Sequence, residues 1–243
     1  MIKFFRKIRH NLINEGKTTK YLKYAIGEIV LVVIGILIAL QINNWNEQRK
    51  QKLNYLNILQ TVKNDIMVDT TSINEVTRYY ENKEYAFLLS KSDSITMEEY
   101  LKCEDCPRII SGFSPVILQT KGYNLLQSFN LSSSIEKDSL NLRLSVFYST
   151  YNLGVEKAVE SCRELFTEYS NIIRESKPWF KEWYDKKLNE DFYEFVLHDP
   201  IYKNRVAQYY FYIYKYYLRI LNEVKTEEEK LLKLIESRLP TEN

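Results

Sequence analysis

Residues 24–46, "YAIGEIVLVVIGILIALQINNWN", decide how the rest of the chain can be arranged. The run from Ala25 to Ile42 is almost entirely apolar, and its two polar residues, Glu28 and Gln41, lie near its ends. As a helix, this run is roughly 27 Å long, close to the hydrocarbon thickness of a bilayer. The sequence therefore predicts a transmembrane helix over residues 25–42.

The flanks of this run indicate a retained, single-pass span with one orientation. Tyr24 and Trp45 place aromatic rings at the two expected membrane interfaces. No small-residue cleavage site of a secretory signal follows the run. Residues 1–24 hold seven Lys/Arg and one Glu, whereas the whole chain has a net charge of only +2. By the positive-inside rule we expect residues 1–24 to be a cytoplasmic basic tail and residues 43–243 to lie outside the cytosol.

The basic tail also bears on possible partners. Because the positive charge is confined to it, we expect no nucleic-acid partner. Residues 2–13 fit either a short amphipathic helix on the membrane surface or a tail that merely sets the topology.

The predicted span carries two features that suit contact with another helix. Glu28 either reaches the headgroups and nearby Lys residues or makes an intramembrane contact, because charges in lipid are costly and usually paired. Gly27, Gly35 and Ala39 share one helix face, and Gly35 and Ala39 have the small-xxx-small spacing that lets helices approach closely. These four residues are the candidates for helix packing within the membrane.

Two stretches resemble a known family. "MIKFFRKIRHNL" and "KYLKYAIGEIVLVVIGILIALQINNWNEQRK" closely resemble the N-terminus of a large family of uncharacterised membrane proteins of Bacteroidota. A weaker resemblance runs through "FSPVILQTKGYNLLQSFNL", where Phe113, Pro115 and Gly122 match the family layout, whereas "NLSSSIEKDS" departs from it. The resemblance implies a bacterial inner membrane and a periplasmic domain, and it implies no activity.

The remainder of the chain is predicted to form long helices. Only 6 Gly and 5 Pro occur in 243 residues, and apolar residues recur at helical spacing. We expect the transmembrane helix to continue to near Leu89. A second helix is expected after Ser133-x-x-Glu136, with an unbroken stripe from Leu140 to Ile172, and a third from Asp199-Pro200 to just before Pro240.

Three such helices should pack together to bury their stripes. The predicted fold class is therefore all-α, with the transmembrane helix continuing into an antiparallel bundle of long helices. Residues 90–133 should form a small irregular cap, with a capping box at Thr96 and a short helix from Ser114-Pro115 to Gly122. The second long helix would then run back toward the membrane.

Two aromatic groups are candidates for surfaces. If the second helix runs back, Trp179, Phe180 and Trp183 lie near the membrane interface; the alternative is a packed aromatic corner. The third helix carries an unusually dense tyrosine run, which forms either a thick core or an exposed contact patch. Its members are Tyr209, Tyr210, Tyr212, Tyr214, Tyr216 and Tyr217.

The sequence holds one motif with reactive potential. Cys103 and Cys106 form a CxxC, for which we expect a local disulfide, while free thiols and a bridge to Cys162 stay open. No Gly-rich phosphate loop, catalytic triad or metal-ligand set accompanies it. The acidic residues of "KTEEEKLLK" (225–233) alternate with Lys and are expected on a solvated helix face.

These observations favour a non-enzymatic, membrane-anchored envelope protein without cofactor or metal. Its bundle is expected to serve as a protein-interaction or accessory module that contacts membrane lipid and either other envelope proteins or further copies of itself. Two alternatives stay open: a periplasmic ligand-sensing domain that signals through a partner, and a thiol–disulfide protein that uses Cys103 and Cys106.

Overall fold

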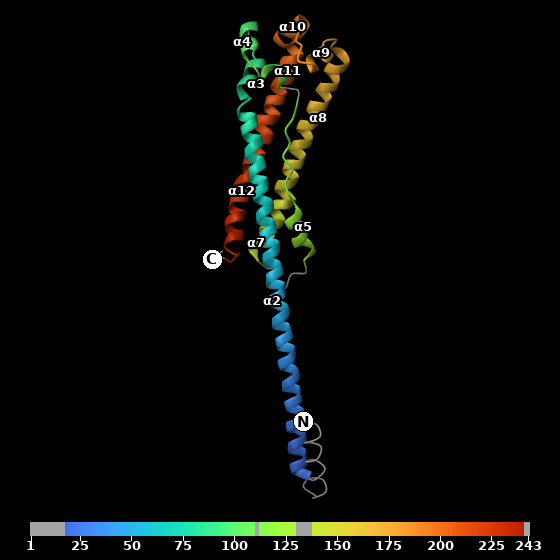
Figure 1. Cartoon of the computed structure of the whole chain (residues 1–243), viewed down its shortest axis with the longest axis vertical. Helices are drawn as coiled ribbons and strands as arrows, with labels where there is room; N and C mark the ends of the chain where they lie inside the picture. Colours follow the sequence, from blue (N-terminus) through green and yellow to red (C-terminus); the bar gives the residue numbers. More distant parts are fainter. Residues whose placement is uncertain (1–17, 110–111, 130–137, 241–243) are drawn as a thin grey trace. The chain divides into compact units, whose positions relative to one another are not determined.

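The computed structural model describes residues 18–109, 112–129 and 138–240, which form helices and no strand (Figure 1). The all-α expectation is therefore confirmed for this part of the chain. The chain divides into two units, residues 1–54 and 55–243, which are described in turn.

Two predicted features lie outside the described residues. These are the amphipathic helix over residues 2–13 and the helix cap formed by Ser133 and Glu136.

In the first unit, the described residues belong to helix α2 (Thr18–Glu81), as far as Asn54. An 18-residue window near the N-terminus has a mean hydropathy of 2.6, and none of it is buried within the structure. Large side chains such as Ile29 and Leu31 are each 62% exposed. Such a continuous apolar surface is unfavourable in water, so this part of α2 is a candidate membrane span.

In the second unit, α2 continues as an amphipathic helix. Leu59, Val62, Ile66 and Ile73 are buried on one face, as the helical spacing predicted. The helical run reaches Ser90, close to the predicted end near Leu89, and a turn at Asn82 and Lys83 divides it into α2 and α3 (Glu84–Ser90). Lys83, in this turn, forms an ion pair with Asp105, and Ala86 and Phe87 of α3 lie in the core.

Short elements occupy the region after α3. They are α4 (Met97–Lys102), the 3-10 turn η1 (Cys106–Arg108) and α5 (Lys121–Ser128). The capping box at Thr96 is present, with Thr96 and Glu99 satisfying each other's backbone amides. The helix predicted from Ser114 to Gly122 is wrong, because residues 112–120 are not helical and Gly122 lies inside α5.

The second long helix consists of three segments: α7 (Ser139–Val146), the π-helical η2 (Phe147–Asn152) and α8 (Leu153–Ser176). Asp138 caps its start by accepting from the amide of Leu140. The wider π turn alters the helix register, so Phe147 and Tyr148 are both buried. Further along, Ile173 is buried while Ile172 is exposed, so the stripe is not unbroken.

The third long helix follows α9 (Phe180–Tyr184) and α10 (Glu190–His198). It comprises α11 (Pro200–Tyr210), the π-helical η3 (Phe211–Tyr217) and α12 (Leu218–Glu236). Asp199 accepts from the amides of Ile201 and Tyr202, and Pro200 occupies the first turn, as predicted.

The contacts between the long helices fix their directions. α12 is antiparallel to α2, because Lys63 pairs with Glu236 and Thr70 bonds to Glu228. α7–α8 is also antiparallel to α11–α12. The contacts that show it are Arg143 with Glu227 and Glu168 with Arg205.

It follows that the first and second long helices run in the same direction, and the hydrogen bond between Tyr55 and Asn141 joins α2, where it enters the second unit, to the start of α7. The expected return of the second helix is wrong. Residues 112–129, between them, bring the chain back instead (Figure 1). A connection of this length is needed because two parallel neighbours cannot be joined by a tight turn.

Candidate functional site

Residues 112–120, which we call the strap, form an extended segment that lies against α2. The amide of Ser114 donates to Tyr80 Oη at 2.9 Å, and that of Gln119 donates to Asp69 Oδ1 at 2.9 Å. Tyr80 and Asp69 are separated by roughly 16 Å of helix. Five residues of strap cover a distance of this order only in a largely extended conformation, because a β-strand advances about 3.3 Å per residue. The strap therefore runs antiparallel to α2 as an extended segment.

Buried carboxylates on α2 hold the end of the strap and the start of α5. Asp69 accepts from Gln119 with both oxygens, and Asp65 Oδ2 accepts from the amide of Gly122 at 2.6 Å. Asp65 therefore acts as a cap for α5 supplied by a distant helix. The contact is close at Gly122, where an added Cβ would lie 2.5 Å from the backbone nitrogen of Val62. Only glycine lets α5 approach α2 so closely.

A third carboxylate, Glu228 of α12, completes an acidic cluster with these two. Glu228 Oε2 accepts from Thr70 Oγ1 at 2.9 Å, whereas Glu228 Oε1 is buried and no hydrogen bond reaches it in the described residues. The Tyr148 hydroxyl is likewise buried, and no hydrogen bond to it is found among the described residues. The solvated position expected for the acidic run is wrong for Glu227 and Glu228, which are 8% and 0% exposed.

Burial controls the ionisation of Asp69 and Glu228. Loss of water raises the pKa of Asp69 to about 7, despite the opposing hydrogen bond from Gln119, and the neighbouring Asp65 adds to the increase. Burial likewise raises the pKa of Glu228 to about 8, with a contribution from Asp69. The arrangement can therefore hold and exchange protons near neutral pH. No set of three or more His, Cys, Asp or Glu in the described residues is arranged to hold a metal ion.

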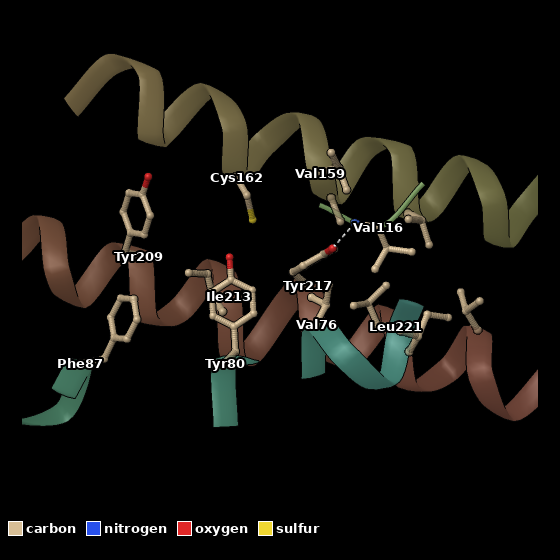
Figure 2. Packing of buried hydrophobic residues seen from close by; sticks show 14 of the residues in the cluster. Val76, Tyr80, Phe87, Val116, Val159, Cys162, Tyr209, Ile213, Tyr217 and Leu221 are labelled. Carbon is tan, nitrogen blue, oxygen red and sulfur yellow. Dashed lines mark hydrogen bonds between the residues drawn. The ribbon is translucent and has the colours of Figure 1, made fainter. Parts of the chain in front are cut away.

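A groove adjoins the strap on the side of α8. Val116, Ile117 and Leu118 line it together with α8 residues from Val155 to Glu164, and it encloses about 520 Å³. Val155 and Val159 provide apolar lining, and Figure 2 shows Val159 close to Val116. The groove's charged residues are Glu156, Glu160, Glu164 and Arg163, so carboxylates predominate.

A second hollow lies on the other side of Ile117. It encloses about 610 Å³ between the strap and α5. Ile117 lines both hollows and is 72% exposed, whereas Val116 and Leu118 are buried.

The tyrosine run of α11 and η3 lies mainly within the domain. Tyr209 and Tyr217 are buried, and Figure 2 shows them with Tyr80 and Ile213 in the core. The Tyr217 hydroxyl donates to Ser114 O and accepts from the amide of Val116 at 2.7 Å, so it anchors the strap. The other four tyrosines are half-buried. They are Tyr210, Tyr212, Tyr214 and Tyr216.

The CxxC pair is joined by a disulfide between Cys103 and Cys106, while Cys162 is free and buried. Both bridged sulfurs belong to nearly inaccessible residues, 8% and 1% exposed. Burial raises the pKa of the Cys162 thiol to about 12. None of the three cysteines therefore presents an accessible thiolate.

The Trp179 segment packs next to this disulfide. Trp183 Nε1 donates to Pro107 O at 2.9 Å, and the Trp179 ring meets Phe192 edge-on. Trp179 is 5% exposed, and Phe180 is half-buried. The reasoning that placed these residues near the membrane required a returning second helix. Because that helix does not return, they lie at the end of the domain formed by α3, α4 and α10 (Figure 1).

The candidate residues of the span all lie on the exposed part of α2. An added Cβ at Gly27 or Gly35 would meet nothing within 4 Å, which leaves their surfaces open for a neighbouring helix. Glu28, Ala39, Tyr24 and Trp45 lie on the same unburied stretch of helix.

Sequence reasoning missed the acidic cluster, although a signal was present. Asp65 and Asp69 are spaced like the buried Val62, Ile66 and Ile73, and so they share the apolar face of α2. Glu228 likewise falls between Val224 and Leu231 in the stripe of α12. Charged residues in the register of an apolar face are the signal for such a site.

The described residues thus form a helical domain that follows a candidate membrane span in the chain. Comparison with protein families assigns residues 28–191 to a family of unknown function, DUF6090. The match covers well over half of the chain, and the protein belongs to this family. It confirms the expected membership of an uncharacterised family. No curated protein and no solved structure matches the chain.

Proposed function

We propose that the protein is a single-pass protein of a bacterial inner membrane whose periplasmic helical domain binds other envelope proteins, without catalysing a reaction. The observation that carries the proposal is the 18-residue apolar window of α2, none of which is buried. A helix with such a surface needs lipid or other helices around it. The clustered Lys and Arg of residues 1–24 support a cytoplasmic N-terminus.

The disulfide between Cys103 and Cys106 supports a periplasmic domain, because disulfides persist in oxidising compartments. Within the domain, the exposed Ile117 and its two adjoining hollows support binding rather than chemistry. The aromatic hollow lined by Tyr169, Trp179 and Trp183 encloses about 30 Å³, which suits a water molecule. A sensed metabolite would therefore have to occupy one of the two hollows beside Ile117.

Membrane fractionation and topology reporters test this proposal. We expect the full chain to stay in the membrane fraction after an alkaline carbonate wash. A C-terminal alkaline phosphatase fusion should be active, and a C-terminal green fluorescent protein fusion dark. A soluble product, or the opposite reporter pattern, would refute the proposed location.

Crosslinking in intact cells, followed by mass spectrometry, tests the proposed binding. It should recover the same envelope proteins in reproducible ratio to the chain. Recovery of the monomer alone across growth conditions would refute the proposed role.

A further inference from the structure

We propose that the strap is a docking edge for an extended segment of a partner protein, which adds to it as a second β-strand. The partner segment has alternating basic and apolar residues and occupies the groove between the strap and α8. This inference rests on the proposed function, because it names the surface and the kind of partner through which the domain binds.

The first observation is the asymmetry of the strap's two edges. In an extended strand, successive residues direct their N–H and C=O groups to opposite edges. The amides of Ser114 and Val116 face the core, where they bond to the hydroxyls of Tyr80 and Tyr217. Where this alternation holds, Pro115 and Ile117 direct their backbone groups to the other edge; it ends before Gln119, whose amide turns back to Asp69 on α2. In the described part of the chain, no hydrogen bond reaches the backbone of either residue.

An unpaired strand edge is a template for pairing with another chain. Pro115 has no N–H and limits the pairing to its carbonyl and to the N–H and carbonyl of Ile117. The pairing site is thus short, and the groove has to supply further contacts. Ile117, 72% exposed, stands beside the position that an added strand would take.

The lining of the groove defines the side chains of the occupant. A strand beside the strap has alternate side chains that point inward and outward. The inward ones meet Val155 and Val159, which favours apolar residues. The outward ones lie near the exposed Glu156, Glu160 and Glu164, which favours Lys or Arg.

Glu156, Glu160 and Glu164, which we call the acidic row, are spaced to fit an extended occupant. Residues four apart on α8 are separated by about 6 Å along its axis. Alternate residues of a β-strand are separated by about 6.6 Å. Basic residues at every second position of the occupant would therefore each meet one glutamate.

The acidic row is not matched from within the groove. Arg163 is the only cation of its lining, against three carboxylates. Glu160 bonds to the exposed Lys157, and Glu156 accepts from Asn152. Such exposed ion pairs are weak, and an incoming cation can replace them.

A defined peptide tests the inference with the full chain in detergent micelles. The probe is a fluorescent seven-residue peptide with blocked ends that alternates lysine and valine. Its matched controls contain glutamate in place of lysine, or proline in place of the central valine. Binding is measured by fluorescence anisotropy, and pairing by hydrogen exchange at the Ile117 amide.

We expect the lysine–valine peptide to bind and to slow exchange at Ile117, and both control peptides to bind at least about tenfold more weakly. The triple variant Glu156→Lys, Glu160→Lys, Glu164→Lys should weaken binding by about tenfold or more, because three ion pairs are lost. A matched triple variant at exposed sites elsewhere should bind like the wild type. It consists of Glu98→Lys, Glu175→Lys and Glu229→Lys.

Other results would overturn the inference. Equal binding of the proline peptide would show attraction by charge alone, without strand pairing. Absence of binding would exclude the groove as such a site. A dimer that dissociates in the Ile117→Lys variant would show that a second copy of the chain occupies it.

Crosslinking in cells with the groove variant separates this inference from the proposed function. If the wild type and the triple variant recover the same envelope partners equally, the domain binds elsewhere and only the groove assignment fails. If neither recovers a partner, the proposed function itself fails.

Discussion

The buried carboxylate Asp69 should make the helical domain less stable at neutral and alkaline pH than at mildly acidic pH. In the unfolded chain this carboxyl ionises near its ordinary pKa of 3.8, whereas in the folded domain burial raises the pKa to about 7. The folded state therefore binds more protons than the unfolded state between these two values. Stability is lost as the pH rises from about 4 to about 7, and it is constant above that.

The magnitude follows from the difference between the two pKa values. Each unit is about 1.4 kcal/mol, so roughly 3 units give an upper bound of about 4 kcal/mol. Relaxation around the charge reduces this, and we expect a loss of about 2–4 kcal/mol in the free energy of unfolding. Asp69 is 0% exposed, so solvent screening does little to weaken the effect. Glu228 extends the same trend to about pH 8.

The Asp69→Asn variant isolates this contribution. The amide oxygen of asparagine can still accept from Gln119, but it carries no charge at any pH. We expect the variant to resemble the wild type or be about 1 kcal/mol less stable at pH 5, because the added NH₂ group is buried. At pH 8 it should be more stable than the wild type by about 1–3 kcal/mol.

Urea unfolding of the full chain in micelles, followed by circular dichroism from pH 5 to pH 8, measures this difference. Asp185→Asn, at an exposed position, is the matched control and should change stability by less than about 0.5 kcal/mol at either pH. If the wild type and Asp69→Asn show parallel pH profiles, Asp69 is not protonated in the folded domain and the reasoning is refuted.

Three further changes test the packing around the strap and the core. Gly122→Ala should lower the free energy of unfolding by about 1–3 kcal/mol in urea titrations, because the added Cβ would meet the Val62 backbone. The control Gly112→Ala should cost far less, because a Cβ added there has no atom within 4 Å. Tyr217→Phe leaves the buried amide of Val116 without its acceptor, so exchange at that amide should speed up and stability fall by about 1–3 kcal/mol; an unchanged exchange rate would show that the hydroxyl does not hold the strap. Leu59→Ala should lower the thermal midpoint through a loss of about 2–5 kcal/mol, whereas Leu53→Ala, at a 52% exposed position, should change it little, and equal effects would contradict the core assignment.

Much of the helical structure could be predicted because it depends on neighbouring residues. The capping box at Thr96 and the cap at Asp199-Pro200 involve residues within one turn of each other, and both are present. The break in α2 at Asn82 was missed because no Gly or Pro marks it. The π turns were missed for a similar reason: they depend on packing between long helices and have no local code.

The candidate site was harder to predict because its parts meet only through tertiary contacts. The strap was mistaken for a helix because Ser114-Pro115 is a common helix start, and local sequence carries no sign of the hydroxyls of Tyr80 and Tyr217. Its extended form is imposed by the distance it has to cover between Tyr80 and Asp69. Likewise, Glu228 resembles an exposed helix residue until Thr70 is brought against it.

The amino-acid sequence by itself determined the helical class, the helix starts at Thr96 and Asp199 and the candidate span, since these follow from propensity, capping and the length of an apolar run. Only the tertiary structure decided that the first and second long helices are parallel, that the strap returns the chain between them and that Asp69 and Glu228 are buried together. The physical reason is that helix direction and the ionisation of buried groups depend on contacts between residues far apart in the chain, which no local pattern encodes.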